Sequence, residues 1–247
     1  MSPSLSILAA VVAVALVSFA VFATRHGAPR DADAERKGSR FLLGVGDLLV
    51  HWFMWALGPA ERALAGAGAT PDHLNALGLT AGALSGVLIG TGRLEAGGWA
   101  ILLAGACDVL DGRLARASGV ASLYGKFIDS TLDRFVETFA FLGFAAYFAA
   151  RPWGPLVVAS GLAGSLLVSY AQARGETVGV VGSGGLMQRA ERLALQIFGC
   201  LFDPPLSRAL GWSAGSVLFW VLAAIAVGAL GTAVHRTIFI ARRLRAR

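Results

Sequence analysis

The chain has 247 residues, of which 56% are hydrophobic and 15% are charged, and its mean hydropathy is +0.67. This composition is too apolar for a soluble domain of this size, and its 32 glycines are typical of closely packed membrane helices. The net charge of +6 does not indicate a nucleic-acid partner, because the basic residues lie next to apolar runs and are predicted to face anionic lipid headgroups. The two cysteines, Cys107 and Cys200, lie in apolar segments and predict neither a disulfide framework nor a zinc site.

The chain begins with an almost unbroken apolar run, residues 5–23, which has about the length needed to span a bilayer. No basic residues precede this run and no small-residue cleavage site follows it. We therefore predict a retained transmembrane anchor over residues 1–24 rather than a signal peptide. The polar segment that follows, residues 25–40, has mixed charge and no apolar periodicity, and it is predicted to be a cytoplasmic linker.

Residues 41–69 are apolar but contain scattered polar groups and tryptophans, including Trp52 and Trp55. This mixture is typical of a helix that lies in the membrane interface, although a membrane crossing stays open. Gly58-Pro59 is predicted to end the first helix of this segment.

Residues 70–247 are predicted to form an all-α membrane domain of six transmembrane helices. The predicted spans are residues 73–89, 99–118, 123–150, 155–174, 186–201 and 216–241. If the linker is cytoplasmic, only Arg93, Arg151 and Arg208 of the 21 basic residues fall in the outer loops. This asymmetry places both ends of the bundle in the cytoplasm.

Four aspartates lie within the second and third predicted spans. Asp108 and Asp111 are three residues apart, Asp129 and Asp133 are four apart, and each pair therefore shares a helix face. The short connection at residues 118–122 makes the two helices antiparallel neighbours, so the pairs can converge. Four ionised carboxylates would cost on the order of 10 kcal/mol in a membrane unless water or cations face them. Carboxylate oxygens in this number predict Mg²⁺ or Mn²⁺, with room for two ions.

The residues between the aspartates indicate what the cations would serve. Gly112 and Gly125 allow a ligand to approach the backbone closely, and Arg113 and Arg116 are suited to phosphate oxygens. Together these features predict a pyrophosphate site. The alternative is that the aspartates form ion pairs with basic residues at a solvated helix end. The spacing of all four aspartates, together with both glycines, disfavours this alternative. The partners would then be Arg113, Arg116, Lys126 and Arg134.

The spacing Asp108-x2-Asp111-Gly112-x2-Ala115-Arg116-x8-Gly125-x3-Asp129-x3-Asp133 resembles the signature of the CDP-alcohol phosphotransferases at every fixed position. The resemblance extends over about residues 70–247, and Asp72 and Asn75 depart from the usual opening segment. It implies a six-helix core, two divalent metal ions and transfer of a substituted phosphoryl group from a CDP-linked donor to an alcohol, with release of CMP.

The resemblance also implies roles for individual residues. Asp133 is the general base that deprotonates the acceptor hydroxyl, and it also contacts metal. The other metal ligands are Asp108, Asp111 and Asp129. The residues expected against the cytidine diphosphate are Asp111, Gly112, Ala115, Arg116 and Gly125.

Three segments resemble the prokaryotic phosphatidylinositol phosphate synthases within this family: residues 127–134, 169–176 and 185–193, with Gly175 as a departure. These enzymes join a CDP-diacylglycerol donor to inositol phosphate. Carried over by position, the residues expected to bind the acceptor phosphate are Ser130, Arg174 and either Arg189 or Arg192, with Lys126 or Arg134. The arginines could instead reach lipid headgroups as membrane anchors.

The resemblance therefore implies a phospholipid-synthesis enzyme in the inner or plasma membrane of a prokaryote, with its active site facing the cytoplasm. It further implies a homodimer and a small anionic alcohol as acceptor. Transfer to glycerol 3-phosphate is the alternative within the family. A membrane prenyltransferase and a cation transporter are the alternatives outside it. The sequence leaves the purpose of residues 1–69 open.

Overall fold

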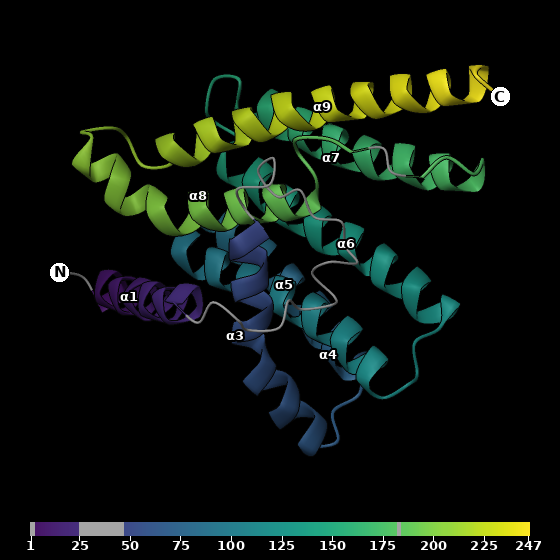
Figure 1. The fold of residues 1–247 in the computed structure, drawn as a ribbon. Coiled ribbons are helices and arrows are strands. Elements are labelled where there is room, and N and C mark those ends of the chain that lie inside the picture. Colours follow the sequence, from purple (N-terminus) through teal and green to yellow (C-terminus); the bar gives the residue numbers. More distant parts are fainter. Residues whose placement is uncertain (1–2, 25–46, 182–183) are drawn as a thin grey trace. The chain divides into compact units, whose positions relative to one another are not determined.

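The protein was analysed as a computed structural model, which describes residues 3–24, 47–181 and 184–247 (Figure 1). All regular elements in these ranges are helices, which confirms the all-α class. The helices are α1 (Pro3–Thr24), α3 (Asp47–Gly66), α4 (Pro71–Gly90), α5 (Leu94–Ala117), α6 (Leu123–Tyr147), α7 (Gly154–Thr177), α8 (Arg189–Ala209) and α9 (Ser216–Arg245). The predicted linker, residues 25–40, and the start of the predicted interfacial segment, residues 41–46, lie outside the described residues.

Three helices, α4, α7 and α9, are long and apolar enough to cross a membrane. The described part of α1 contributes a shorter apolar helix, Ala9–Thr24. The predicted spans that became α5, α6 and α8 are less apolar, because they carry many of the charged residues singled out above. The chain is thus a membrane protein by its apolar helices, and the count of six spans stays a prediction.

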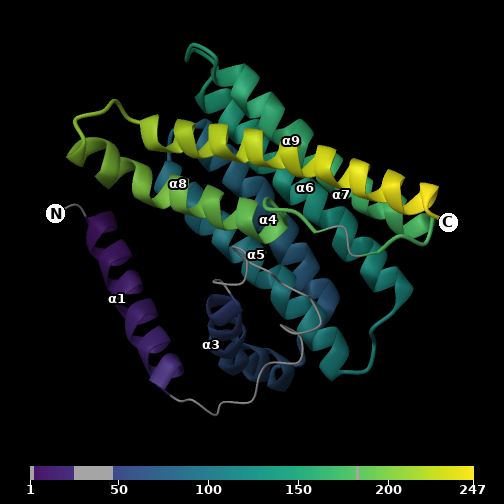
Figure 2. The ribbon, with the colours of Figure 1, turned by 45° about the horizontal axis from the view of Figure 1, so that its top comes forward.

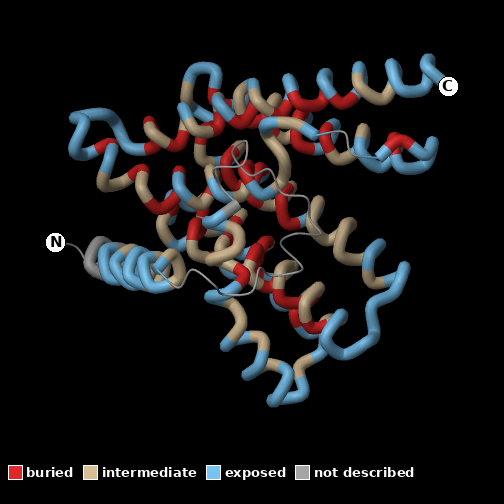
Figure 3. Tube along the Cα trace, in the orientation of Figure 1, coloured by how far each residue is buried: buried red, intermediate tan, exposed pale blue. Residues whose placement is uncertain are grey.

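The chain divides into two compact units, whose boundaries cut through α4, α5 and α6. The first unit contains the described residues up to 78, together with residues 105–130. In it α1 packs against α3, where the indole Nε1 of Trp52 donates a hydrogen bond of 2.8 Å to Ser18 Oγ. Figure 3 shows that most of residues 9–24 of α1 are nevertheless exposed.

The prediction that Gly58-Pro59 ends a helix is wrong, because α3 continues through Pro59 to Gly66. Leu57 and Leu64 are seven residues apart and lie on one face of α3. Both pack against a buried cluster formed by Leu74, Cys107, Leu110 and Leu114. This shared packing stabilises the helix across the proline, although Pro59 cannot donate a backbone hydrogen bond.

The second unit contains residues 79–104 and 131–247. In this unit α9 packs along both α7 and α8 (Figures 1 and 2). Among the described residues, the largest core cluster includes Ile89, Ile101, Phe141, Phe144, Leu218, Leu222 and Ile225. Figure 3 draws all buried residues of the described ranges in red.

Glycines let α4 and α6 approach closely within the second unit. A Cβ atom on Gly86 would clash with the backbone carbonyl of Phe139, and one on Gly143 would clash with the carbonyl of Gly86. Such contacts between small residues are a usual way for membrane helices to associate.

The expected connector after residue 201 is partly helical, which corrects the predicted end of that span. Helix α8 continues through Pro204 and Pro205 to Ala209. The buried carboxylate of Asp203 fixes this end of the helix to the start of α9. It accepts hydrogen bonds from the backbone N–H groups of Gly215 (2.8 Å) and Leu218 (3.1 Å) and from Ser207 Oγ (3.0 Å). These contacts outside the helical ladder hold the proline-containing turn in place.

Candidate active site

The turn between α5 and α6 is built by capping residues. Gly119 adopts a left-handed conformation with φ of 68°, and the N–H of Val120 donates to Ala115 O at 3.0 Å, which closes the end of α5. Ser122 Oγ then accepts the N–H of Gly125 at 3.1 Å and caps the start of α6. The two helices that carry the aspartates are therefore joined by a short connection, as the sequence predicted.

The structure brings carboxylates of the two helices together. An oxygen of Asp108 on α5 lies within 4.8 Å of an oxygen of Asp129 on α6, and both residues belong to the first unit. Asp133 follows Asp129 by one turn of α6. Asp111 lies one turn after Asp108 and is only 4% exposed. A donor set made only of carboxylate oxygens fits a hard divalent cation such as Mg²⁺ or Mn²⁺.

The residues predicted to face the nucleotide lie on the same stretch of α5 and at the start of α6. A Cβ atom at Gly112 would lie 3.2 Å from Nη1 of Arg116, so the glycine leaves room for that guanidinium. Arg116 is exposed, and Ala115 and Gly125 are partly exposed. These positions are therefore accessible to a ligand.

Arg113 is a predicted phosphate ligand or partner of the aspartates, and the structure also gives it a partner outside the motif. Its Nε donates to Glu61 Oε2 of α3 at 2.6 Å. Sequence reasoning missed Glu61, because it lies 52 residues from Arg113 and outside the motif.

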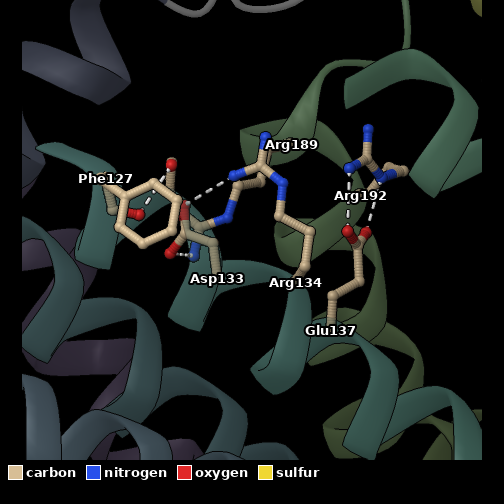
Figure 4. A network of polar contacts seen from close by, with 7 residues as sticks. Phe127, Asp133, Arg134, Glu137, Arg189 and Arg192 are labelled. Carbon is tan, nitrogen blue, oxygen red and sulfur yellow. Dashed lines mark hydrogen bonds and ion pairs between the residues drawn. The ribbon is translucent and has the colours of Figure 1, made fainter. Parts of the chain in front are cut away.

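An ion pair connects α6 to α8 in the second unit. Nη2 of Arg189 lies 2.5 Å from Oδ1 of Asp133 (Figure 4), and the neighbouring Arg134 lies 3.9 Å from the other carboxylate oxygen. The side chains of Arg189 and Asp133 are 31% and 14% exposed. The predicted base and one predicted acceptor ligand thus come together at a site that solvent can reach.

A second ion pair lies one turn further along both helices. Arg192 donates through Nε and Nη2 to the two carboxylate oxygens of Glu137, at 2.7 and 3.1 Å (Figure 4). Its Nη1 also donates to Met187 O at 3.2 Å, and the Arg192 side chain is only 1% exposed. Arg192 is therefore held by a protein carboxylate away from solvent. Glu137 was not singled out from the sequence, although an acid within a predicted span was a usable signal.

The other predicted acceptor ligands lie in more open positions. Arg174 is exposed near the end of α7, and Lys126 is exposed in the first turn of α6. Ser130 Oγ donates to its own helix, to Phe127 O at 3.0 Å.

The structure also reveals a buried arginine that the sequence analysis did not single out. Arg236 on α9 is 3% exposed, and its Nη1 donates to Val168 O (3.0 Å) and to Gln172 Oε1 (2.8 Å) of α7. An arginine within a predicted apolar span is a signal that could have found it.

Comparison with known proteins agrees with these features. The profile of the CDP-alcohol phosphatidyltransferase family matches residues 69–227. The phosphatidylinositol phosphate synthase of Mycobacteroides abscessus is 35% identical over 182 residues, which cover 72% of this chain and 81% of that protein. The enzyme of the same name from Streptomyces avermitilis is 35% identical over 204 residues, or 77% of this chain and 80% of that protein.

Solved structures show the same similarity. Mycobacterium tuberculosis phosphatidylinositol phosphate synthase with bound CDP-DAG has a TM-score of 0.63 and 30% identity, and the match covers 74% of this chain and 92% of that chain. The structure of that enzyme in complex with manganese and citrate has a TM-score of 0.65 and 29% identity, with 74% and 87% coverage. Manganese in this relative and the clustered aspartates here support the predicted divalent-metal cofactor. The predicted family is confirmed: the chain is a phosphotransferase that belongs to the CDP-alcohol phosphatidyltransferase family.

Proposed function

We propose that this enzyme transfers the phosphatidyl group of CDP-diacylglycerol to a hydroxyl of a phosphorylated polyol, with inositol phosphate as the acceptor. The products are phosphatidylinositol phosphate and CMP. Relatives with this name are about 35% identical to the chain over most of its length. The contact between Arg189 and Asp133 is the structural observation that supports this acceptor best.

Arg189 is suited to recognise the acceptor's phosphate. Its guanidinium is partly exposed and lies directly on the carboxylate that the family motif identifies as the base. A phosphate dianion that entered here would compete with Asp133 for Arg189, because arginine binds phosphate through charge-assisted hydrogen bonds. Binding of the acceptor would therefore leave the carboxylate of Asp133 next to the hydroxyl that has to lose its proton. A phosphate-free alcohol such as choline or free inositol would not release Asp133 in this way.

Asp133 then acts as the general base. It accepts the proton of the acceptor hydroxyl while the hydroxyl oxygen forms a bond to the β-phosphorus of the donor. The bond between this phosphorus and the bridging oxygen breaks, and CMP leaves with the electron pair. The transfer thus moves one proton to Asp133 and releases one leaving group, CMP.

The aspartates of α5 and α6 would hold the divalent ions. We assign Asp108, Asp111, Asp129 and Asp133 as ligands, because they supply oxygen donors on adjacent turns of two connected helices. When bound, such ions polarise phosphoryl oxygens and offset the charge that develops on the leaving phosphate.

The cytidine diphosphate would lie against the end of α5 and the start of α6. Gly112 and Gly125 keep the helix surfaces free of side chains, and Ala115 keeps its side small. Arg116, whose guanidinium fits beside Gly112, is the cation for the diphosphate.

The remaining candidate ligands have secondary parts in this scheme. Arg174, Ser130, Lys126 and Arg134 are proposed to flank the acceptor, and Arg134 already lies 3.9 Å from Asp133. Arg192 is proposed to support the site by fixing α8 to Glu137, since its guanidinium is already bound by that carboxylate.

We further propose that residues 70–247 form six transmembrane spans in a prokaryotic inner membrane, with the active site facing the cytoplasm. In this arrangement α1 is an additional anchor and α3 lies in the interface. The protein is proposed to be a homodimer. Cysteine accessibility in spheroplasts, with single cysteines beside Arg93 and at Arg245, tests the orientation. Cross-linking in detergent tests the dimer.

The test of function is a panel of acceptors offered to the purified protein with CDP-diacylglycerol and Mg²⁺. Inositol phosphate, glycerol 3-phosphate, free inositol and choline are scored by lipid product and by CMP release. We expect inositol phosphate to be the preferred acceptor and the two phosphate-free alcohols, free inositol and choline, to be inactive. Preference for glycerol 3-phosphate or for a phosphate-free alcohol would refute the proposed acceptor.

A further inference from the structure

Gln196 on α8 is a buried polar residue that the proposed mechanism does not use. Its side chain is 1% exposed, and its Nε2 has no hydrogen-bond partner among the residues that the structure describes. A buried N–H group that makes no hydrogen bond destabilises a protein, so each instance calls for an explanation.

Gln196 lines a small pocket that also contains the proposed base and the proposed phosphate ligand. Asp133, Glu137 and Ala140 line it from successive turns of α6, and Arg189 and Leu193 line it from α8. All of these residues belong to the second unit. Asp133 and Arg189 are partly exposed, whereas Ala140 and Gln196 are 2% and 1% exposed. The pocket therefore passes from a solvent-accessible charged end to a buried end at Gln196.

The size of the pocket restricts what can reach the amide. The cavity has a volume of about 10 Å³, which is about the space that one water molecule needs. A phosphate group or a whole sugar ring does not fit into this space. A single hydroxyl group does, because its oxygen is the size of a water oxygen.

We propose that Gln196 forms a hydroxyl-recognition subsite, in which its Nε2 donates a hydrogen bond to one hydroxyl of the polyol acceptor. This hydroxyl is neither the attacking one, which belongs at Asp133, nor the phosphorylated one, which belongs at Arg189. The inference rests on the proposed function, because it needs a polyol phosphate at Asp133 and Arg189.

The chemistry of the surrounding groups supports a neutral donor role for Gln196. The carboxylate of Glu137 is bound through both oxygens by Arg192, so a protein cation already occupies it. Leu193, Ala140 and Ile101 offer only apolar surface. The amide is thus a polar group in an otherwise apolar end of the pocket. A site built to donate to a hydroxyl discriminates against an acceptor that lacks it, because the amide then stays unpaired.

The subsite is tested with the full-length enzyme, CDP-diacylglycerol and Mg²⁺, with inositol phosphate and its monodeoxy analogues as acceptors. For the wild type we expect one analogue to have a kcat/KM about tenfold or more below that of the parent. Gln196→Leu, which has a similar size but no donor, should show a loss of the same order with the parent acceptor. It should show no further loss with that analogue, because the two changes remove the same hydrogen bond.

Ser165→Ala is the matched control. Ser165 is also fully buried, and its Oγ has no partner among the described residues, but it lies on α7 and does not line the pocket. This variant should keep the wild-type order of analogues. Gln196→Leu should also unfold at the wild-type temperature or above it, because it removes a buried unpaired N–H group. If Gln196→Leu does not fold, Gln196→Asn, which keeps a shortened amide, takes its place and should weaken the same discrimination.

The outcomes distinguish failure of the proposed function from failure of the subsite alone. If the wild type transfers to no polyol phosphate, the proposed function fails and the subsite fails with it. If the wild type is active but Gln196→Leu keeps the same selectivity among the deoxy analogues, only the subsite is refuted, and Gln196 then binds a resident water. Selective loss of discrimination at one hydroxyl position supports the subsite.

Discussion

Two arginine–carboxylate pairs lie one helical turn apart along α6 and α8, and they differ in exposure and geometry. Arg189 meets Asp133 through a short contact of 2.5 Å, with side chains that are 31% and 14% exposed. Arg192 meets Glu137 through two hydrogen bonds, with side chains that are 1% and 9% exposed. The first pair lies where solvent and ligands can reach it, and the second is closed off from both.

The difference indicates how one pair of helices can serve both chemistry and structure. An exposed ion pair contributes little net stability and can exchange its partner for a ligand. A buried pair is costly to break, because removal of one partner leaves the other charge buried and uncompensated. We therefore expect changes in the first pair to affect catalysis and changes in the second to affect stability.

The largest expected effect is on turnover. Asp133→Asn should lower kcat by about 10³-fold or more, because the amide cannot accept the proton. The free energy of unfolding should change little, since the pair with Arg189 is partly exposed. Mg²⁺-dependent CMP release and thermal unfolding in detergent measure the two quantities. Turnover near the wild-type rate would remove Asp133 from the role of base.

The opposite pattern is expected for the buried pair. Arg192→Ala should lower the free energy of unfolding by about 3–5 kcal/mol, because Glu137 is left as an unpaired buried charge. The double variant Glu137→Leu/Arg192→Met should recover much of this loss, since no buried charge remains. Thermal or denaturant unfolding in detergent provides the measurement. A single variant as stable as the wild type would contradict the structural role of the pair.

Arg189 should affect one substrate and not the other. Arg189→Ala removes a charge-assisted contact, so we expect the KM for inositol phosphate to rise about 10- to 100-fold. The KM for CDP-diacylglycerol should stay close to that of the wild type, and Arg189→Lys should lose less than Arg189→Ala. Steady-state kinetics with each substrate varied in turn separates the effects. An equal rise in both KM values is the result that excludes a specific contact with the acceptor.

The smallest expected effect concerns a third pair of intermediate exposure. Glu61 and Arg113 are 19% and 13% exposed and are joined by a contact of 2.6 Å. Glu61→Gln should lower the free energy of unfolding by about 1 kcal/mol or less. The exchange Glu61→Arg with Arg113→Glu should restore part of it, and a double-mutant cycle measures the coupling. A coupling energy as large as that of Arg192 and Glu137 would show that burial does not determine how strongly each pair stabilises the protein.

The sequence predicted those features of the site that depend on residue type and on local helix geometry. Asp108 and Asp129 could be placed together, because helix periodicity gives the face of each residue and a five-residue connection makes the helices neighbours. Gly119 and Ser122 mark that connection with ordinary capping chemistry. These relations are local, so the sequence alone carries them.

Contacts between distant segments could not be predicted in this way. The helix does not end at Pro59, because packing of Leu57 and Leu64 outweighs the local preference. Glu137 gains its significance from Arg192 of α8, which lies 55 residues away along the chain. Gln196 gains its significance from the pocket that it lines together with residues of α6. The sequence likewise left Arg189 and Arg192 equivalent, and their burial and their carboxylate partners distinguish them.

The two sets of side-chain contacts that hold α8 have a consequence for how acceptor specificity can evolve in such enzymes. Arg192 ties the helix to α6 near its beginning, and Asp203 ties it to α9 about three turns later. These two contacts restrain rotation and translation of α8 when a residue between them is substituted. Position 196 lies in that interval, so evolution can replace this one side chain and alter which alcohol is accepted while the surrounding walls stay where they are.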